Sequence, residues 1–423
     1  MDLATTLKSE TVQTAVREIG INPNYWYPLG WSDQLKRGQA IQVIVWQQPL
    51  ALYRDEAGGL HALDDRCPHR GVELHRGKVS GEHLACAYHG WRFDGDTGEC
   101  VSIPYLPPEQ KRPCVSVRSY PVQEKHGLMW VFPGEPHLAL ERSLPQVDEF
   151  DQDGWFMVPI TAEFKAHFSV CNENAMDVFH GFLHQELQGW FDPLLLDLKA
   201  TDSAISAKYQ VSYKGVLAKF LGLAERADEV TTLPISINYR YPHYASSLEG
   251  ISSVYLMRLP IGPDESRSFA LFFFRLRLPR WLVKLAYPAL SRIVRRFMLQ
   301  PFLAQDVEMM ESEQRQYRRR PERYVEINPA IIALQRVMVR QYEQFIASST
   351  ERSMARQWGS PASESKPFPS GDRAIEVRPS AGRDQAVAGV ESDAKAEVSA
   401  SRERGSVACG PHQARTVTVS SEE

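Results

Sequence analysis

Two short stretches, RCPHRG at residues 66–71 and CAYHGW at residues 86–91, each place a cysteine close to a histidine. The chain has 423 residues and only 6 cysteines, too few and too scattered for a disulfide framework, so reduced thiols or metal ligands are expected. Thiolates bind soft metals and iron–sulfur clusters, whereas imidazole is a borderline ligand. The two stretches therefore predict one metal site with mixed ligands. Its candidate ligands are Cys67, His69, Cys86 and His89.

Two kinds of metal site accept two cysteines and two histidines. A structural zinc site is closed and tetrahedral, but its usual spacing keeps like ligands together, whereas each pair here mixes the two types. A Rieske [2Fe–2S] centre requires the mixture, because two cysteines hold one iron and two histidines hold the other. The spacing favours the iron–sulfur centre, while zinc and a chance grouping stay open. The nearby His61, His75 and His83 fall outside the pattern and are expected at the surface.

A second group of metal-binding side chains follows in ENAMDVFHGFLH at residues 173–184. Asp177, His180 and His184 recur at intervals of three and four, so on a helix they project from one face. Two histidines and one carboxylate form the facial triad of non-heme Fe(II) oxygenases, which leaves positions open for dioxygen and substrate. An amphipathic helix with hydrogen-bonded histidines is the alternative.

CPHRG followed by CAYHGW resembles the Rieske signature, in the form typical of the ring-hydroxylating oxygenases. The residues that match this family's mononuclear iron motif are Asn174, Asp177, His180 and His184. The resemblance implies that both histidines bind the iron, whereas Asp177 bridges His180 to a Rieske histidine of a neighbouring subunit. That partner would be His69 or His89. The resemblance also implies a ring-shaped homotrimer in which electrons cross the subunit interface.

The third iron ligand is expected farther along the chain. The resemblance implies an aspartate on a late helix, and LAQDVEMMESEQ at residues 303–314 offers Asp306 as the preferred ligand. Glu308 and Glu311 are the alternatives. Without the resemblance, an acidic cluster on a helix would be taken for a solvated face.

Local patterning divides the chain into four segments: an N-terminal segment over 1–21, an all-β Rieske domain over 22–136, a catalytic domain over 137–348 and a tail over 349–423. Short apolar runs between turn residues predict the strands of the Rieske domain. The catalytic segment predicts a helix packed on an antiparallel sheet, so the fold class is α+β. The tail is poor in large apolar residues and is expected to be disordered. The elements predicted in the catalytic segment are a helix over 168–187, strands at 205–213, 235–241, 251–259 and 268–278, and a helix over 279–320 broken or kinked at Pro288 and Pro301.

Charge and hydropathy indicate which partners the protein can bind and where in the cell it is expected. A formal net charge of -4 gives no general attraction to nucleic acid. The N-terminus lacks the apolar core of a signal peptide and no run reaches the length of a membrane span, which predicts a cytoplasmic protein. Residues 280–302 gather four cations on one arc of a helix, a pattern that also allows peripheral contact with an anionic membrane. These cations are Lys284, Arg292, Arg295 and Arg296.

The resemblance implies an oxygenase that holds a Rieske [2Fe–2S] cluster and a mononuclear Fe(II). The chain shows no dinucleotide-binding motif, so electrons from NAD(P)H are expected through a separate reductase or ferredoxin. With O2, the enzyme would hydroxylate a small, apolar, ring-containing organic substrate. A membrane-lipophilic pigment (a chlorophyll derivative or carotenoid) and a small aromatic acid are the alternative substrates. The apolar side chains expected around the substrate are Phe179, Phe182, Leu183, Trp190 and Phe191.

Two other functional classes stay open on the sequence alone. A Rieske electron-transfer protein without its own oxygenase site would use the second domain only as a docking scaffold. A zinc-stabilised interaction module would hold no iron.

Overall fold

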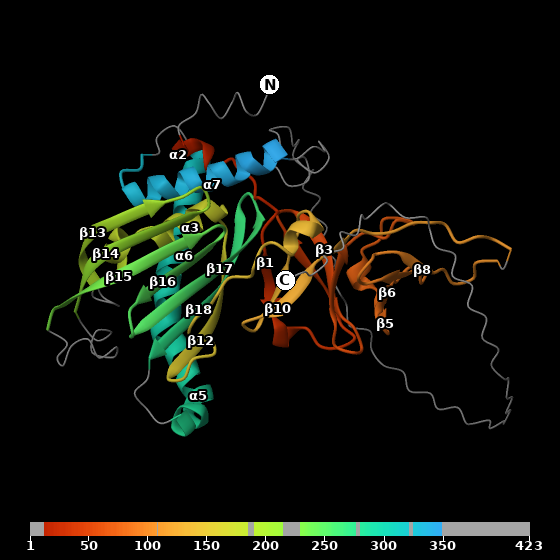
Figure 1. Cartoon of the computed structure of the whole chain (residues 1–423), viewed down its shortest axis with the longest axis horizontal. Coiled ribbons are helices and arrows are strands. Elements are labelled where there is room, and N and C mark those ends of the chain that lie inside the picture. Colours follow the sequence, from red (N-terminus) through yellow and green to blue (C-terminus); the bar gives the residue numbers. More distant parts are fainter. Residues whose placement is uncertain are drawn as a thin grey trace, which may run out of the picture. The chain divides into compact units, whose positions relative to one another are not determined.

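The computed structural model of the protein describes residues 12–107, 109–184, 190–214, 229–275, 280–320 and 325–348 (Figure 1). The tail predicted to be disordered, over 349–423, lies outside the described residues, as do residues 185–187 of the first predicted helix. Four described cysteines, Cys67, Cys86, Cys100 and Cys171, are free and buried, as expected, whereas Cys114 is disulfide-bonded.

The N-terminal part of the described chain, up to η3 and called the first half below, folds into three small antiparallel sheets. This confirms the all-β prediction. Strands β1 (Tyr27–Trp31), β11 (Leu128–Val131) and β10 (Val122–Lys125) form one sheet. Strands β2 (Ala40–Val45), β3 (Gln48–Arg54), β4 (Leu60–Asp64) and β9 (Ser119–Tyr120) form the second. Strands β5 (Lys78–Ser80), β6 (His83–Ala85), β7 (Arg92–Asp94) and β8 (Cys100–Ser102) form the third. Short 3-10 turns at η1 (Ser32–Gln34) and η2 (Leu74–Arg76) connect these sheets, and a third, η3 (Pro136–Ala139), follows β11.

The second half is built on one seven-stranded antiparallel sheet. Its strands, in spatial order, are β12 (Trp155–Phe164), β18 (Glu265–Arg275), β17 (Ser252–Gly262), β16 (His243–Leu248), β15 (Thr231–Arg240), β14 (Ala204–Tyr213) and β13 (Trp190–Ala200). The four predicted strands correspond to β14, β15, β17 and β18, whereas β12, β13 and β16 were not predicted. Helices on this sheet confirm the α+β fold class. The domain boundaries at 136/137 and 348/349 stay predictions.

The apolar run of β18 reflects burial on both faces of the sheet. Phe269, Leu271 and Phe273 pack into the large core that extends into the first half of the chain. Ala270, Phe272 and Phe274 belong to a second core, which includes Val294 and Leu299 of the helical segment on the other face. Successive side chains of a strand point to opposite faces, so one strand contributes to both cores.

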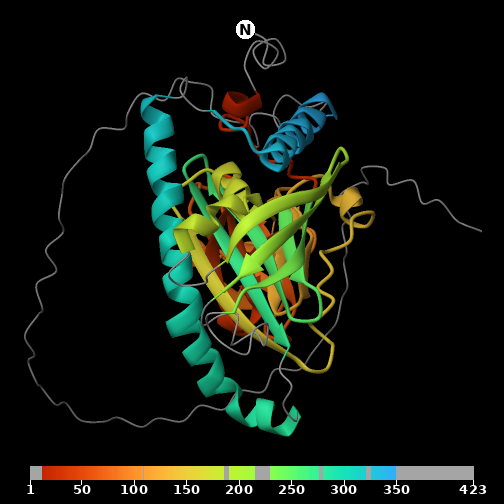
Figure 2. The same ribbon diagram turned by 90° about the vertical axis from the view of Figure 1, so that its left-hand side faces the viewer.

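Helices cover the sheet. They are α2 (Val12–Ala15), α3 (Phe168–Met176), η4 (Phe179–His184), α5 (Arg280–Val294), η5 (Arg295–Leu299), α6 (Gln300–Arg319) and α7 (Pro329–Ser348). The segment from α5 to α6 runs along the sheet as a helical rod (Figure 2). Pro288 lies inside α5, while Pro301 lies in the first turn of α6, directly after the π-helical turn η5. None of the described helices has the length and hydropathy to cross a lipid bilayer.

The helix predicted over 168–187 is shorter than expected. It ends at Met176, and Asp177 adopts an extended conformation with φ of -82° and ψ of 105°. A separate 3-10 turn, η4, then carries His180 and His184. The expectation that Asp177 and both histidines project from one α-helical face is therefore wrong, although the two histidines still come close together.

A hairpin tip joins the two halves. Trp46 and Gln47 connect β2 to β3, and their N–H groups donate to the carbonyls of Pro260 and Ile261 at 2.8 and 2.6 Å. The Trp46 side chain is fully buried and contacts Phe168 edge to face, with ring centroids 5.7 Å apart. One core thus includes residues of both halves.

A buried ion-pair network fixes the helices that later form the candidate iron site. Arg17 donates to both carboxylate oxygens of Glu173 in α3, at 2.5 and 2.8 Å, and to Glu313 in α6 at 2.7 Å. It also donates to Ser169 Oγ at 2.6 Å. Burial raises the pKa of Glu313, and Arg17 counteracts the shift. A single guanidinium therefore holds α3 beside α6.

Replacing Arg17 by methionine should lower the free energy of unfolding by about 3–5 kcal/mol, because it leaves the buried Glu173 carboxylate without its cation. Denaturant titration of the iron-loaded protein measures the change. Arg340→Met is the matched control, since its ion pair with Asp202 is exposed, with side chains 47% and 70% accessible. This control should change stability by about 1 kcal/mol or less. Equal losses in the two variants would contradict the role of Arg17.

Candidate metal centres and cavity

Two loops of the same construction carry the first group of candidate ligands. Cys67 follows β4, and Cys86 follows β6. In each loop the cysteine carbonyl accepts from a glycine four residues later, Gly71 at 2.8 Å and Gly90 at 3.0 Å. Both glycines have positive φ, 73° and 68°, a conformation that glycine adopts without strain. Each cysteine N–H then donates to the carbonyl five residues later, at 2.8 Å.

The loops sort the ligands by type. Cys67 and Cys86 are buried, whereas His69 and His89 are exposed. The two imidazole rings lie 4.6 Å apart between centroids, and His69 stacks on Trp91 with an interplanar angle of 5°. Paired thiols inside and paired imidazoles outside match a cluster with a cysteine-bound and a histidine-bound iron.

The chemistry of the thiols also fits a cationic cluster. Burial raises the pKa of Cys67 to about 11, and hydrogen bonding to the Cys86 thiol raises it as well. The backbone N–H groups of His69 and Arg70 hydrogen-bond the Cys67 sulfur and oppose this shift. Iron would supply the positive charge that two adjoining thiolates need, and the N–H groups would stabilise the sulfur.

The three histidines near the loops that were expected at the surface are buried or half-buried. His61 is buried, with Nε2 3.1 Å from Asp55 Oδ2 and Nδ1 3.0 Å from Asp96 Oδ1. His75 is half-buried, with Nδ1 2.6 Å from Asp65 Oδ2. Their carboxylate partners provide the polar contacts that burial requires, which the histidine pattern alone did not reveal. His83 is also half-buried.

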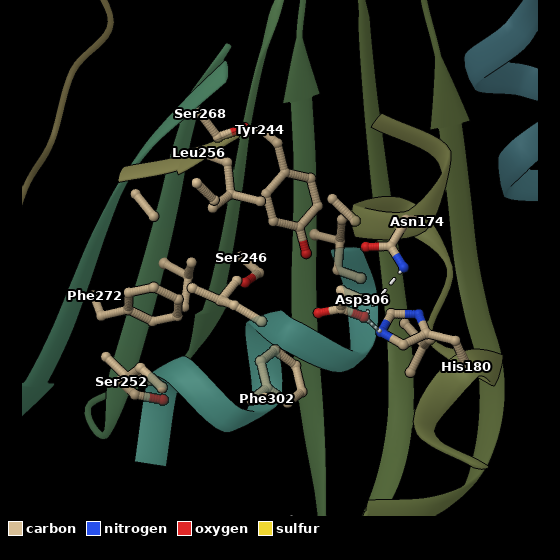
Figure 3. Close-up of a pocket in the computed structure, with 18 of the residues that line it drawn as sticks. Asn174, His180, Tyr244, Ser246, Ser252, Leu256, Ser268, Phe272, Phe302 and Asp306 are labelled. Atoms are coloured by element: carbon tan, nitrogen blue, oxygen red, sulfur yellow. Dashed lines mark hydrogen bonds and ion pairs between the residues drawn. The ribbon is translucent and has the colours of Figure 1, made fainter. Parts of the chain in front are cut away.

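The second group comes together at the junction of η4 and α6. His180, His184 and Asp306 each offer a ligand atom within 4.8 Å of the other two. His184 Nε2 lies 3.1 Å from Asp306 Oδ1, and His180 Nε2 lies 3.8 Å from the same oxygen. Figure 3 shows His180 and Asp306 facing each other across one end of a cavity. The predicted triad is therefore assembled in space.

The donor set of this group fits a metal cation. His184 Nδ1 lies 2.9 Å from Gln305 Oε1, an oxygen that can only accept, so the ring nitrogen is a donor there. The Nε2 atom of His184 faces the Asp306 carboxylate, so a metal cation could be bound by a ring nitrogen and a carboxylate oxygen there. Burial lowers the pKa of His180, which favours its neutral, metal-binding form. Gln305 was not predicted, because an amide next to an aspartate on a helix carries no sequence signal.

Asn174 and Asp177 lie beside the triad. Asn174 Nδ2 donates to Asp306 Oδ1 at 3.3 Å and so orients the carboxylate. Asp177 Oδ1 accepts from the Phe179 N–H at 3.0 Å and from Asn328 Nδ2 at 3.1 Å. Its carboxylate thus contacts Asn328, the residue just before α7, and does not belong to the triad.

The alternative carboxylates lie elsewhere on α6. Glu308 is exposed, and Glu311 accepts from the backbone N–H of Lys165 at 3.1 Å. Neither belongs to the group that could hold a metal with His180 and His184. Among the described residues a second group of this kind is formed by Glu82, His83 and Asp94 near the surface.

A cavity of about 390 Å³ extends from the triad between the sheet and the helical rod. Its described lining is mainly apolar, and Figure 3 shows Phe272 and Phe302 among the side chains that surround it. Of the apolar residues expected around a substrate, Trp190 belongs to the described lining, whereas Phe179, Phe182, Leu183 and Phe191 do not. The volume suits a drug-sized organic molecule.

Comparison with known proteins identifies both halves of the chain. Residues 25–121 match the Rieske [2Fe-2S] domain, and residues 164–347 match the vanillate O-demethylase oxygenase C-terminal domain. The chain is 34% identical over 361 residues to the 4beta-methylsterol monooxygenase of Methylococcus capsulatus, covering 82% of this chain and 95% of that protein. It is 32% identical over 205 residues to the oxygenase component of dicamba O-demethylase of Stenotrophomonas maltophilia, covering 47% of this chain and 59% of that protein.

A solved structure shares the fold. The crystal structure of dicamba monooxygenase bound to 3,6-dichlorosalicylic acid superposes with a TM-score of 0.66 and 23% sequence identity, over 78% of this chain and 100% of that chain. Since the similarity to the methylsterol enzyme extends over almost that protein's whole length, the chain belongs to the Rieske non-heme iron oxygenases.

Proposed function

We propose that this Rieske oxygenase hydroxylates a methyl group on a sterol-like, polycyclic alcohol. The observation that supports this proposal most directly is the apolar cavity, which is lined by His180 and Asp306, two of the three residues of the triad. The full-length relative named for a methylsterol supports the substrate class. In the balanced reaction, R–CH3, O2, two electrons and two protons give R–CH2OH and water.

Each cofactor of the family has a proposed set of ligands in this chain. The Rieske [2Fe–2S] cluster would be held by Cys67, His69, Cys86 and His89. The mononuclear iron would be held by His180, His184 and Asp306, and would supply a site for activating O2 beside the substrate. Asn174 and Gln305 would orient the carboxylate and one imidazole. Membership of an oxygenase family sets aside the electron-carrier and zinc-module alternatives.

Electron delivery would involve other molecules. The chain belongs with oxygenase components, so a separate reductase or ferredoxin supplies electrons. Neither cysteine–histidine loop lines the cavity, and in Figure 1 the sheet with β6 lies beyond β1 and β3 from the seven-stranded sheet. We therefore propose a homotrimer in which Asp177 bridges His180 to His69 or His89 of the next subunit. Asp177 is half-buried, and Asn328 orients its carboxylate.

An aromatic acid fits the cavity less well than a neutral alcohol. Relatives named for toluene-4-sulfonate and 3-chlorobenzoate have anionic substrates. The one cation in the described cavity lining is Arg258, which is 3% exposed. Its guanidinium donates to Asn172 Oδ1 at 3.0 Å, to the Cys171 carbonyl at 2.5 Å and to Ser268. These contacts already use the charge that an anionic substrate would need.

The surface near the cavity favours contact with a lipid membrane, which we also propose. Leu285 and Phe297 are 75% and 74% exposed, and Phe297 belongs to the cavity lining. The exposed Arg292, Arg295 and Arg296 could attract anionic lipid headgroups. The Lys284 side chain lies outside the described residues. The protein should co-sediment with vesicles that contain anionic phosphatidylserine and not with neutral vesicles. Equal co-sedimentation with both kinds of vesicle, or sedimentation caused only by a change in the protein's oligomeric state, would overturn this proposal.

The substrate class is tested by turnover of the purified, iron-loaded oxygenase with a compatible reductase, NADH and O2. A 4-methylsterol should yield its 4-hydroxymethyl product, detected by mass spectrometry with the mass shift of ¹⁸O from ¹⁸O2. Dicamba and toluene-4-sulfonate serve as aromatic comparators. Conversion of the aromatic acids without any sterol product would contradict the proposed class.

Replacing Asp306 by alanine should remove the mononuclear iron, about one third of the total, and abolish product formation while the cluster's visible spectrum stays intact. Iron analysis and absorbance measure the two centres separately. Glu308→Ala, on the same helix but exposed, is the control and should keep both. Full iron content in Asp306→Ala would show that another residue is the third iron ligand.

Replacing Asp177 by asparagine should leave both metal centres loaded and slow turnover by about 10–100-fold, because the charge of the bridge is lost while its shape is kept. Stopped-flow oxidation of the reduced cluster locates the defect in electron transfer.

Oligomers mixed from Cys86→Ser and His180→Ala chains should regain activity that neither parent has. Inactive mixed oligomers, once verified, would argue for transfer within one chain, and iron loss in Asp177→Asn would make this residue a ligand.

A further inference from the structure

A patch of hydroxyl groups interrupts the apolar wall of the cavity. Tyr244 and Ser246 are two residues apart on β16, so their side chains project to the same face of the sheet. Tyr213, at the end of β14, contributes a third hydroxyl to the lining. Both tyrosines are only 7% exposed. This patch is defined as Tyr213, Tyr244 and Ser246, of which the two tyrosines are shielded from bulk solvent and Ser246 is half-buried.

The patch is uncharged and able both to donate and to accept hydrogen bonds. Burial raises the pKa of Tyr244 to about 12, while its hydrogen bond with Ser246 opposes the shift. Burial also raises the pKa of Tyr213, and the nearby Tyr244 raises it further. Each phenol therefore stays protonated at neutral pH. Such hydroxyls suit a neutral alcohol or carbonyl oxygen, since a hydroxyl can both donate and accept.

The patch lines the same cavity as His180 and Asp306 of the triad. Arg258 interacts electrostatically with both Tyr244 and Asp306. Figure 3 shows the Tyr244 hydroxyl pointing into the cavity, between Ser246 and the Asp306 carboxylate in this view. The guanidinium itself is engaged by Asn172, Ser268 and the Cys171 carbonyl, so Tyr244 and Ser246 are better placed than Arg258 to meet a ligand.

We propose that Tyr244 and Ser246, assisted by Tyr213, bind the ring hydroxyl of the substrate and so select which carbon faces the iron. This inference rests on the proposed function and deepens it. In a sterol, the hydroxyl-bearing carbon is bonded to the carbon that carries the 4-methyl group. Fixing that oxygen on the patch therefore places the neighbouring methyl group toward the triad. Tyr244 is a specificity-determining residue in this arrangement.

The expected effect is discrimination against a substrate that lacks the hydroxyl. A site built to bind a hydroxyl leaves its own buried polar groups unpaired when the analogue binds. The wild-type enzyme should prefer a 4-methylsterol over its 3-deoxy analogue by about 10–100-fold in kcat/KM and in dissociation constant, the range of one or two such hydrogen bonds. Without the Tyr244 hydroxyl, this preference should fall to about threefold or less.

The experiment crosses the two ligands with four forms of the iron-loaded enzyme: wild type, Tyr244→Phe, Ser246→Ala and Tyr239→Phe. Dissociation constants come from equilibrium dialysis of labelled 4-methylsterol and its 3-deoxy analogue, and kcat/KM comes from product analysis. Tyr239 is the matched control, because its hydroxyl is buried without a hydrogen-bond partner and its residue is not part of the described lining. Iron content and visible spectra verify that each variant is intact, and Ser246→Ala tests the patch if Tyr244→Phe does not fold.

The inference holds if Tyr244→Phe or Ser246→Ala weakens only the hydroxylated ligand, while Tyr239→Phe keeps the wild-type preference. Equal weakening of both ligands, or an unchanged preference in both patch variants, would overturn it while sterol turnover by the wild type still upheld the proposed function. If the wild type neither binds nor converts the 4-methylsterol, the proposed substrate class fails, and this inference fails with it.

Discussion

The Asp306 carboxylate, buried against two imidazoles, is the constraint around which the catalytic half is arranged. Its Oδ1 faces His184 at 3.1 Å and His180 at 3.8 Å, and it accepts from Asn174 at 3.3 Å. These side chains come from α3, η4 and α6, so the site exists only while the three elements keep their positions. The Arg17 network stabilises two of them by pairing with carboxylates on α3 and α6. A residue near the N-terminus thereby helps to hold α3 beside α6, the helices that carry Asn174 and Asp306.

The two faces of the seven-stranded sheet have different roles: one packs in the shared core, and the other lines the cavity. Alternate residues of β18 enter the core shared by both halves, while Ala270, Phe272 and Phe274 face the helical rod and line the cavity. The cavity therefore lies between a rigid sheet and a helix that also carries Asp306. Such a site can hold an apolar molecule with one end at the metal, and its few polar groups then decide orientation. Tyr244 and Ser246 illustrate this division, since they interrupt an otherwise apolar wall.

The sequence predicted the chemistry better than the architecture around it. The two Cys–His stretches and the His180–His184 pair could be recognised directly as candidate ligands, because residue spacing within a loop or turn is local. Asp306 needed the family resemblance, since its contact with His184 is made across the fold. The strand β16 was missed because it is short, and the helix boundary at Met176 was missed because no Gly or Pro marks it. The burial of His61 depended on Asp55 and Asp96, whose proximity only the folded chain reveals.

The central claim is that one chain holds two distinct iron centres, a mixed-ligand cluster and a three-ligand mononuclear site. Mössbauer spectroscopy of the wild-type protein, reconstituted with ⁵⁷Fe and sulfide and then reduced, tests this most directly. The account predicts cluster iron and high-spin mononuclear Fe(II) in a ratio of about 2:1, with the two cluster irons distinguishable because one has thiolate and the other imidazole ligands. A spectrum containing cluster iron alone, with the mononuclear component absent from fully loaded protein, would contradict it.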